Sequence, residues 1–345
     1  MTKINEFNPT KDILEMLDGL KKRTKSILIK RFGLGEDYKM TLESIGSTYK
    51  ITRERVRQIE SVALAELKKS PKIAGLNKYE AMLEDLLNEH GKIMEHNFLM
   101  SEFRKKYNLD PIHNNAIEFV LKVSSKFNSI KENEEIKKTW SLVDANLDYS
   151  KKVINSFVLN LEGKGKPVLE NNLSNGFELE IKDSKTLVSY LSLSKKILKN
   201  PFNEWGLSKW REIVPKGVKD KAYIVLEKFN KPAHFTKITE LINSAKFDTK
   251  TAIPQTVHNE LIKDQRFVLV GRGMYALKKW GFQQGTVAEI IEKVIIESGK
   301  TLSKENIINK VLEQRFVKKN TIVLALQNKQ RFQRVNGLYC LAGNK

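Results

Sequence analysis

Apolar residues recur at helical spacing through residues 10–70, in short runs separated by breaks. The first runs contain Ile13, Leu14, Leu17, Leu20, Ile27, Leu28, Ile29 and Phe32, and Gly33-Leu34-Gly35 ends them. Thr41 is expected to cap a short helix over 42–49. A longer helix is expected from Arg53 to about Lys69, because the residue before Pro71 avoids helical backbone. This part of the chain therefore predicts a group of short helices.

A different pattern closes the chain. Residues 266–277 and 331–341 both read Arg-Phe, two residues, Val, a turn with glycine, Tyr, one residue and Leu. Alternating apolar positions on both sides of a glycine turn predict a β-hairpin, whose turn needs positive φ. Amphipathic helices precede each hairpin, and helices followed by a hairpin predict a winged helix.

Two earlier blocks repeat this pattern more weakly. Phe127 and Ile130 precede Trp140 and Leu142, and Pro201-Phe202 precedes Trp205-Gly206-Leu207. Such repetition favours several small domains over one large core. The stretch 163–167, Gly-Lys-Gly-Lys-Pro, is interpreted as a loop or linker, because its glycines lack the strand and helix context of a phosphate-binding loop.

The strongest motif lies within residues 41–60 and predicts a helix-turn-helix. Its small core is expected to contain Ile45, Tyr49, Ile51, Val56 and Ile59. Gly46 would lie where the two helices approach most closely. Lys50-Ile51 would form the turn, with modest strain if the φ of Lys50 is positive. Thr52 is a good N-cap for the second helix.

The outer face of that second helix carries side chains that can read DNA. Three of the chain's twelve arginines, Arg53, Arg55 and Arg57, fall here, together with Glu54 and Gln58. Arginine recognises guanine, glutamine recognises adenine and glutamate accepts from the cytosine amino group in the major groove. The alternative is an ordinary charged and solvated helix face, which would not explain the capped turn and the crossing glycine in the same register.

These residues resemble a known family. The segments 31–35, 41–46 and 51–60 are similar to region four of bacterial primary sigma factors, with the resemblance spanning about residues 10–70. It implies binding to the promoter −35 element and docking on the flap of RNA polymerase. By resemblance, Arg53, Glu54 and Gln58 read bases, while Thr52, Arg55 and Arg57 hold phosphates or adjacent edges. Val62, Ala65 and Glu66 depart from the basic residues usual there, and no segment resembles the −10-melting helix of a complete sigma factor.

A second resemblance lies further along the chain. Residues 232–242, 257–261 and 266–277 are similar to the HARE helix-turn-helix domain, a winged-helix-like module found in the delta subunit of RNA polymerase. The predicted fold is therefore mainly α, with a sigma-region-four helix-turn-helix followed by tandem small winged-helix-like domains with short β-hairpins. The predicted domains are 1–75 (sigma-like), 76–147 and 148–212 (winged-helix-like), 213–282 (HARE) and 283–345 (winged-helix-like).

Composition adds a bias toward polyanionic partners. The net charge is +20 and the pI is about 9.7, which favours nucleic acid, although a lysine-rich surface also follows from an AT-biased genome.

One cysteine, Cys340, and no apolar leader or membrane span suggest a cytoplasmic protein without a membrane partner. No nucleophile motif or metal-ligand spacing is visible, so we expect a non-enzyme with no cofactor or metal.

Two functions remain open on the sequence. One is a DNA-binding transcription regulator that reads a −35-like element of double-stranded DNA in contact with RNA polymerase, without being a complete sigma factor. The other is a delta-like accessory protein of RNA polymerase that does not read DNA specifically. Arg53, Glu54 and Gln58 favour the first, because docking on the polymerase flap would not require them. A third reading, the DNA-recognition part of a restriction system, rests only on the HARE resemblance.

Overall fold

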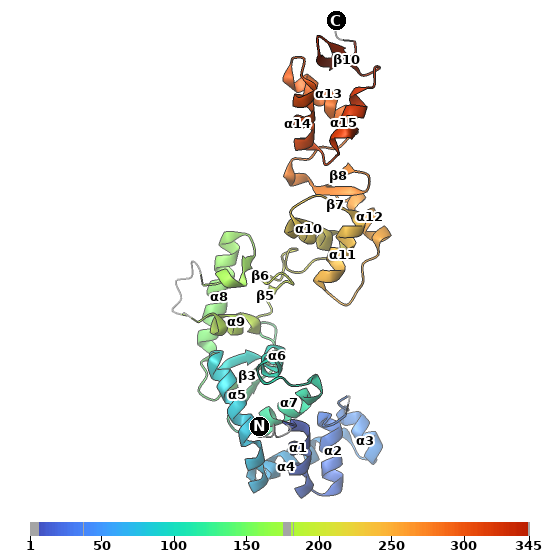
Figure 1. The fold of residues 1–345 in the computed structure, drawn as a ribbon. Helices are drawn as coiled ribbons and strands as arrows, with labels where there is room; N and C mark the ends of the chain where they lie inside the picture. The colour runs from blue at the N-terminus through green and yellow to red at the C-terminus, as the bar shows by residue number, and fades with distance from the viewer. Residues whose placement is uncertain (1–6, 37, 175–180, 182, 344–345) are drawn as a thin grey trace, which may run out of the picture. The chain divides into compact units, whose positions relative to one another are not determined.

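The computed structural model describes residues 7–36, 38–174, 181 and 183–343. The chain divides into two compact units. The first comprises Met1–Leu198 with Trp205–Ser208, and the second comprises Lys199–Glu204 with Lys209–Lys345. The described part is mainly helical with small sheets of two or three strands, which confirms the predicted fold class (Figure 1).

The chain begins with four helices, which we call the N-terminal helices. They are α1 (Pro9–Met16), α2 (Lys22–Phe32), α3 (Leu42–Tyr49) and α4 (Arg53–Lys69), with a 3-10 turn over Leu17–Gly19. The predicted bounds of α3 and α4 are confirmed. Thr41 caps α3 by accepting from the Ser44 N–H at 3.1 Å, and Ser70, ahead of Pro71, is extended where α4 ends.

Four repeats of related topology follow. Repeats 1 and 2 lie in the first unit, apart from Lys199–Glu204 of the second hairpin, and repeats 3 and 4 lie in the second unit. Repeat 1 contains α5 (Asn77–Glu89), β1 (Ile93–Glu95), α6 (His96–Tyr107), α7 (Asn114–Val123), β2 (Phe127–Ile130) and β3 (Thr139–Leu142). Its strands are antiparallel in the order β1-β3-β2. Repeat 2 contains α8 (Leu147–Lys164), β4 (Val168–Leu169), α9 (Ser184–Leu193), β5 (Ile197–Lys199) and β6 (Glu204–Leu207), in the order β4-β6-β5.

The second unit holds the other two repeats. Repeat 3 contains α10 (Val218–Phe229), β7 (Ala233–His234), α11 (Phe235–Ala245), α12 (Pro254–Lys263), β8 (Phe267–Gly271) and β9 (Met274–Leu277). Repeat 4 contains α13 (Val287–Ser298), α14 (Lys304–Gln314), α15 (Lys319–Leu326), β10 (Phe332–Val335) and β11 (Leu338–Leu341). A single bridge from Leu302 to Tyr339 replaces its first strand. All four repeats are thus winged-helix-like.

Both late hairpins form as the sequence predicts. Phe267 pairs with Leu277, and Phe332 pairs with Leu341. Positive φ occurs at Gly273 in the first turn and at Asn336 and Gly337 in the second. The hairpin prediction is therefore confirmed together with its physical reason.

Two local predictions were wrong. The first strand of the hairpin in repeat 2 is Ile197–Lys199, whereas Pro201-Phe202 lies in the turn, because proline has no N–H for a ladder. Gly163 and Lys164 are not a linker but the last turn of α8, which ends where Gly165 adopts the left-handed conformation at φ 62°.

The apolar core of the first unit continues from the N-terminal helices into repeat 1. Leu28, Phe32 and Leu67 are buried in the same cluster as Phe119 and Trp140. The rings of Phe32 and Phe119 meet edge to face, with centroids 5.0 Å apart. The boundary predicted at residue 75 therefore separates helices that share one core. That domain boundary, like the others, stays a prediction.

Candidate nucleic-acid interface

The helix-turn-helix is held in shape by two backbone features of its turn. A Cβ on Gly46 would lie 2.7 Å from the carbonyl oxygen of Ile51, so only glycine fits where α3 meets the turn. Lys50 adopts the left-handed conformation, with φ 51° and ψ 47°, in a region that side chains disfavour. Thr52 then caps α4, its hydroxyl accepting from the Arg55 N–H at 3.2 Å. All three local expectations are confirmed.

The predicted core lies beneath this turn. Ile45 and Val56 are buried with Ile27 of α2, and Tyr49, Ile51 and Ile59 pack around them. The Tyr49 hydroxyl and the Ser26 hydroxyl are hydrogen-bonded at 2.6 Å, so α3 is also fixed to α2. This packing determines which side of α4 faces solvent.

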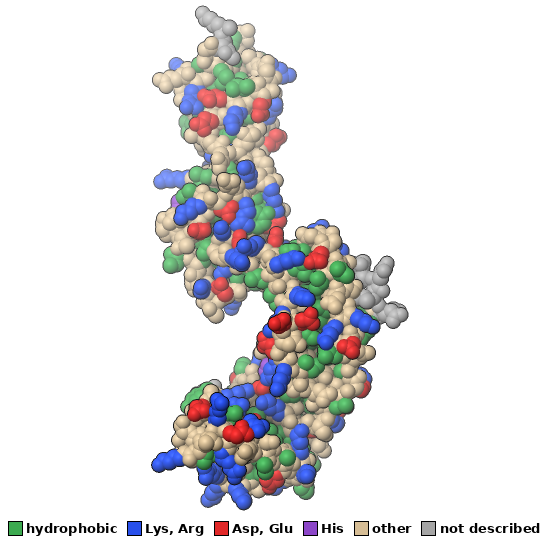
Figure 2. Space-filling view, turned by 180° about the vertical axis from the view of Figure 1, so that it is seen from behind, with side chains coloured by type: hydrophobic (Ala, Val, Ile, Leu, Met, Phe, Trp, Pro, Cys, Tyr) green, Lys and Arg blue, Asp and Glu red, His purple; other side chains and the backbone are tan. Residues whose placement is uncertain are grey.

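All six residues predicted to contact DNA are exposed and lie in the first two turns of α4 or at its cap. They are Thr52, Arg53, Glu54, Arg55, Arg57 and Gln58. The structure thus brings them together on one accessible surface, which we call the α4 face. Lys and Arg side chains gather over the N-terminal helices in the space-filling view (Figure 2).

Two pairs of side chains on the α4 face bind each other. The Arg57 guanidinium donates to both carboxylate oxygens of Glu54, with its Nη2 2.6 Å from Oε1. This hydrogen bond is the main cause that lowers the pKa of Glu54, so the carboxylate stays ionised. Arg55 donates to Oε1 of Gln58 at 3.0 Å, which leaves the Gln58 amide group to donate elsewhere.

Arg53 differs from its neighbours. Among the described residues it has no hydrogen-bond or ion-pair partner. Lys50, exposed at the turn just before Thr52, adds a positive charge beside this face. Lys50 was predicted only as a strained turn residue, and its positive charge beside the α4 face was not predicted. Its exposure and position could have been inferred from the motif.

A buried carboxylate fixes the N-terminal helices to repeat 1. Glu118 of α7 accepts from Lys138 at 2.7 Å and also binds Lys39. Burial would raise the pKa of Glu118, but the bonds to these two lysines outweigh it and lower the pKa to about 2. Nearby, His96 accepts from the Trp140 indole N–H at 3.0 Å. The charges therefore hold a shared structure together and lie outside the α4 face.

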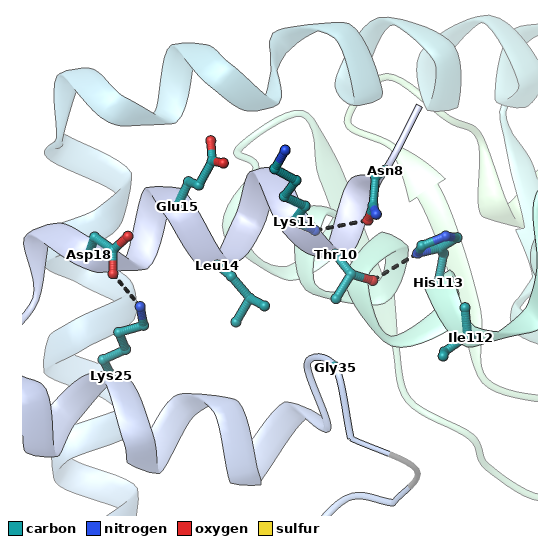
Figure 3. A pocket seen from close by; sticks show the side chains of 10 residues that line it. All are labelled: Asn8, Thr10, Lys11, Leu14, Glu15, Asp18, Lys25, Gly35, Ile112 and His113. Carbon is teal, nitrogen blue, oxygen red and sulfur yellow. Dashed lines mark hydrogen bonds and ion pairs between the residues drawn. The ribbon is translucent and has the colours of Figure 1, made fainter. Parts of the chain in front are cut away.

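A cavity of about 370 Å³ lies on the same boundary (Figure 3). It is lined by Leu14 and Glu15 of α1, by Gly35, and by Ile112 and His113. Thr10 and His113 are hydrogen-bonded across it, with Oγ1 2.8 Å from Nδ1. None of its lining residues belongs to the α4 face, so we assign this cavity to packing between α1 and repeat 1.

The histidines of repeat 3 are structural. His234 caps α11, and His258 lies between Phe235, 4.5 Å away by ring centroids, and Tyr275. Within the described residues, no group of three or more His, Cys, Asp or Glu side chains is placed to hold a metal ion. No helix in the same part of the chain is both long and apolar enough to span a membrane.

Comparison with known proteins identifies the region around the α4 face. The RNA polymerase sigma factor SigA of Nostoc sp. is 40% identical over 68 residues, which are 20% of this chain and 17% of that protein. The protein of the same name from Lactococcus lactis subsp. cremoris is 44% identical over 54 residues, or 16% of this chain and 15% of that protein. The match thus spans less than a fifth of each sigma factor. The family model "Sigma-70, region 4" matches residues 16–69, and this segment is a Sigma-70 region 4 domain.

Proposed function

We propose that this protein is a DNA-binding transcription regulator that reads a −35-like promoter element through the α4 face. The single observation that carries the proposal is the exposure of Arg53, Glu54 and Gln58 together on α4 of a region 4 domain. These side chains match the donors and acceptors on base edges in the major groove. Thr52, Arg55 and Arg57 are proposed to hold the phosphates beside them.

The side-chain contacts on the α4 face support separate roles in base recognition and phosphate binding. Arg53 is free of ion pairs, and the Gln58 amide group keeps its donors, so both are ready to bind bases. Arg55 and Arg57 are the donors of the two internal pairs and retain further N–H groups for phosphate. Because Glu54 stays ionised, it can accept from a cytosine amino group.

Binding of the full chain to two duplexes tests the proposal, one with a −35-like hexamer and one with the same bases scrambled. Gln58→Ala and Arg53→Ala should each weaken binding to the first by on the order of 1–3 kcal/mol and barely change binding to the second. Lys68→Ala, exposed at the far end of α4, is the matched control. Equal losses on both duplexes would overturn base reading.

We also propose that the protein works in the cytoplasm in contact with RNA polymerase and is not a complete sigma factor. In this proposal residues 213–282 are a HARE helix-turn-helix domain, as their sequence resemblance implies.

The claim that the protein is not a complete sigma factor can be tested directly. Single-round transcription with core polymerase on a −35/−10 template should give no specific product when this protein is the only sigma-like factor. Specific transcripts would show that the chain contains a melting element.

The delta-like accessory role is the second candidate, and the α4 face argues against it. A protein that only docks on RNA polymerase would not require Arg53, Glu54 and Gln58 to be exposed together on α4. If all α4 variants bound both duplexes equally well and still bound core polymerase, the accessory role would replace the first proposal.

A further inference from the structure

The four repeats differ in what covers the helix that precedes the hairpin. In repeat 1 this helix is α7, and seven of its residues are buried: Ala116, Ile117, Glu118, Phe119, Val120, Leu121 and Val123. It packs against the N-terminal helices through Phe119 and Glu118. A helix covered in this way has no free face for a nucleic acid.

In repeat 2 the helix before the hairpin is α9, and it is also covered. Within the first unit, α9 lies against β1 of repeat 1, where the Ser189 hydroxyl donates to the Ile93 carbonyl at 2.6 Å. The Tyr190 hydroxyl donates to the Gly91 carbonyl at 3.1 Å. Repeats 1 and 2 therefore use the helix before the hairpin for packing inside the first unit.

In repeat 4 the helix before the hairpin is α15, which keeps one exposed side, although Thr321 in its first turn lines a cavity shared with repeat 3. Ile322 and Leu326 of α15 enter the core of the repeat, while Asn320, Leu324 and Gln327 form an exposed stripe at helical spacing. The Leu324 side chain is 65% exposed. The two amide groups can form hydrogen bonds with base edges, and the leucine between them can contact the thymine methyl group.

Charge separates this face from the rest of the repeat. Residues 314–345 contain no Asp or Glu, whereas α13 and α14 carry all the acidic side chains of the repeat. Lys318 and Lys319 precede the stripe, Lys329 follows it, and Arg334 lies on β10. Among the described residues, none of these four cations has an ion-pair partner.

The hairpin adjoins this helix. A groove of about 410 Å³ is lined by Gln327 and Lys329 on one side and by Arg334 and Tyr339 on the other. The hairpin and the end of α15 therefore face the same space, with cations on both. In repeat 3, α12 is also exposed, but Glu260 and Asp264 lie on or next to it, so the cationic surface is a property of repeat 4.

We propose that α15 and the β10–β11 hairpin form a second DNA contact, which binds the phosphates of duplex DNA independently of any −35-like sequence. The occupant is a polyanion because exposed, unpaired cations surround the stripe without any acidic side chain among residues 314–345. Duplex DNA fits better than an acidic protein surface. The exposed side of α15 can enter a groove of the DNA, and the adjacent cationic hairpin can contact the phosphate backbone.

The test uses the full chain and a duplex without any −35-like hexamer. The triple variant Lys318→Gln, Lys319→Gln, Arg334→Gln removes three cations from the proposed contact. The control variant Lys293→Gln, Lys300→Gln, Lys310→Gln removes three exposed cations from α13, α14 and the loop after α13. Both variants carry the same net charge, so a general loss of positive charge affects them equally.

The slope of log binding constant against log salt should become flatter by roughly three units in the first variant and stay near the wild-type slope in the control. Thermal melting of each variant shows whether repeat 4 is still folded. If the first variant does not fold, Arg334→Gln alone, on the exposed hairpin, should flatten the slope by roughly one unit. Equal slopes in the two triple variants would overturn the proposal, as would lost polymerase binding with an unchanged salt slope.

Discussion

Gly46 and Lys50 show how single residues determine the geometry of the α4 face. The first allows α3 to approach the carbonyl of Ile51, and the second reverses the chain in the left-handed conformation. Neither touches the proposed DNA contact. Both nevertheless fix where Thr52 begins α4, and therefore where Arg53 and Gln58 point.

Gly46→Ala should destabilise the first unit. The added Cβ would lie 2.7 Å from the Ile51 carbonyl oxygen, and relieving that clash should cost about 1–3 kcal/mol of unfolding free energy. Gly75→Ala is the matched control, because nothing lies within 4 Å of its Cβ position and its φ is not positive. Chemical denaturation of both variants checks this, and a neutral Gly46→Ala would mean that the turn relaxes freely.

Arg55 and Gln58 should separate phosphate binding from base reading, although they bind each other. Arg55→Ala should flatten the salt dependence of binding to the −35-like duplex by roughly one unit, because one phosphate contact is lost. Gln58→Ala removes no charge and should leave the slope unchanged. An unchanged slope in Arg55→Ala would remove Arg55 from the phosphate contacts.

At the scale of elements, the sequence predicted α3, α4 and the late hairpins because their signals are local. A capping threonine, a proline and an Asn-Gly turn each determine nearby backbone directly. The first strands of repeats 1, 2 and 3 were missed because β1 has only three residues and β4 and β7 have two each. That is too short for alternation to be visible. The available signal was a capping residue at the end of the strand, such as Glu95, which begins the next helix.

The contact between α7 and the N-terminal helices should make stability depend on pH. The pKa of Glu118 is lowered in the folded protein to about 2, so its stabilisation is present above the unfolded pKa of about 4.3 and is lost as pH falls toward 2. The loss should amount to roughly 3 kcal/mol. About half of this loss should occur between pH 7 and pH 3, and denaturation at these two pH values measures that part.

Glu118→Gln should remove this share of the pH dependence and lower the stability at pH 7, because Lys39 and Lys138 lose their carboxylate. Glu134→Gln, at an exposed position of the same repeat, should behave like the wild type. If Glu118→Gln kept the full difference between pH 7 and pH 3, the cluster around Glu118 would not be its source.

At the scale of the whole molecule, long-range packing was what the sequence could not predict. The sequence does not show which distant segments cover α7 and α9 and leave one side of α15 exposed. Which of them is buried depends on partners far away in the chain, as in the contact between Phe32 and Phe119. The same limit applies to the shared core, which crosses the domain boundary predicted at residue 75.

Tyr275→Ala should unfold the second unit and leave the first intact. Tyr275 is 2% exposed and packs in the core of repeat 3, so its truncation should cost roughly 3–5 kcal/mol. Ile262→Ala, whose side chain is 64% exposed in the same repeat, is the control. Calorimetry of the full chain should show one transition lowered and one unchanged. A single transition lowered as a whole would mean that both units unfold together.

The shared core also limits how such a protein can be recombined. A chimera joined at Ser70-Pro71 would split a single interior, leaving Leu28, Phe32 and Leu67 without the side chains that cover them. A junction after β3, where the cluster ends, would carry the region 4 domain together with its cover. For transplanting the region 4 domain onto another protein, the exchangeable part is therefore the N-terminal helices plus repeat 1, about twice the length of the sequence motif itself.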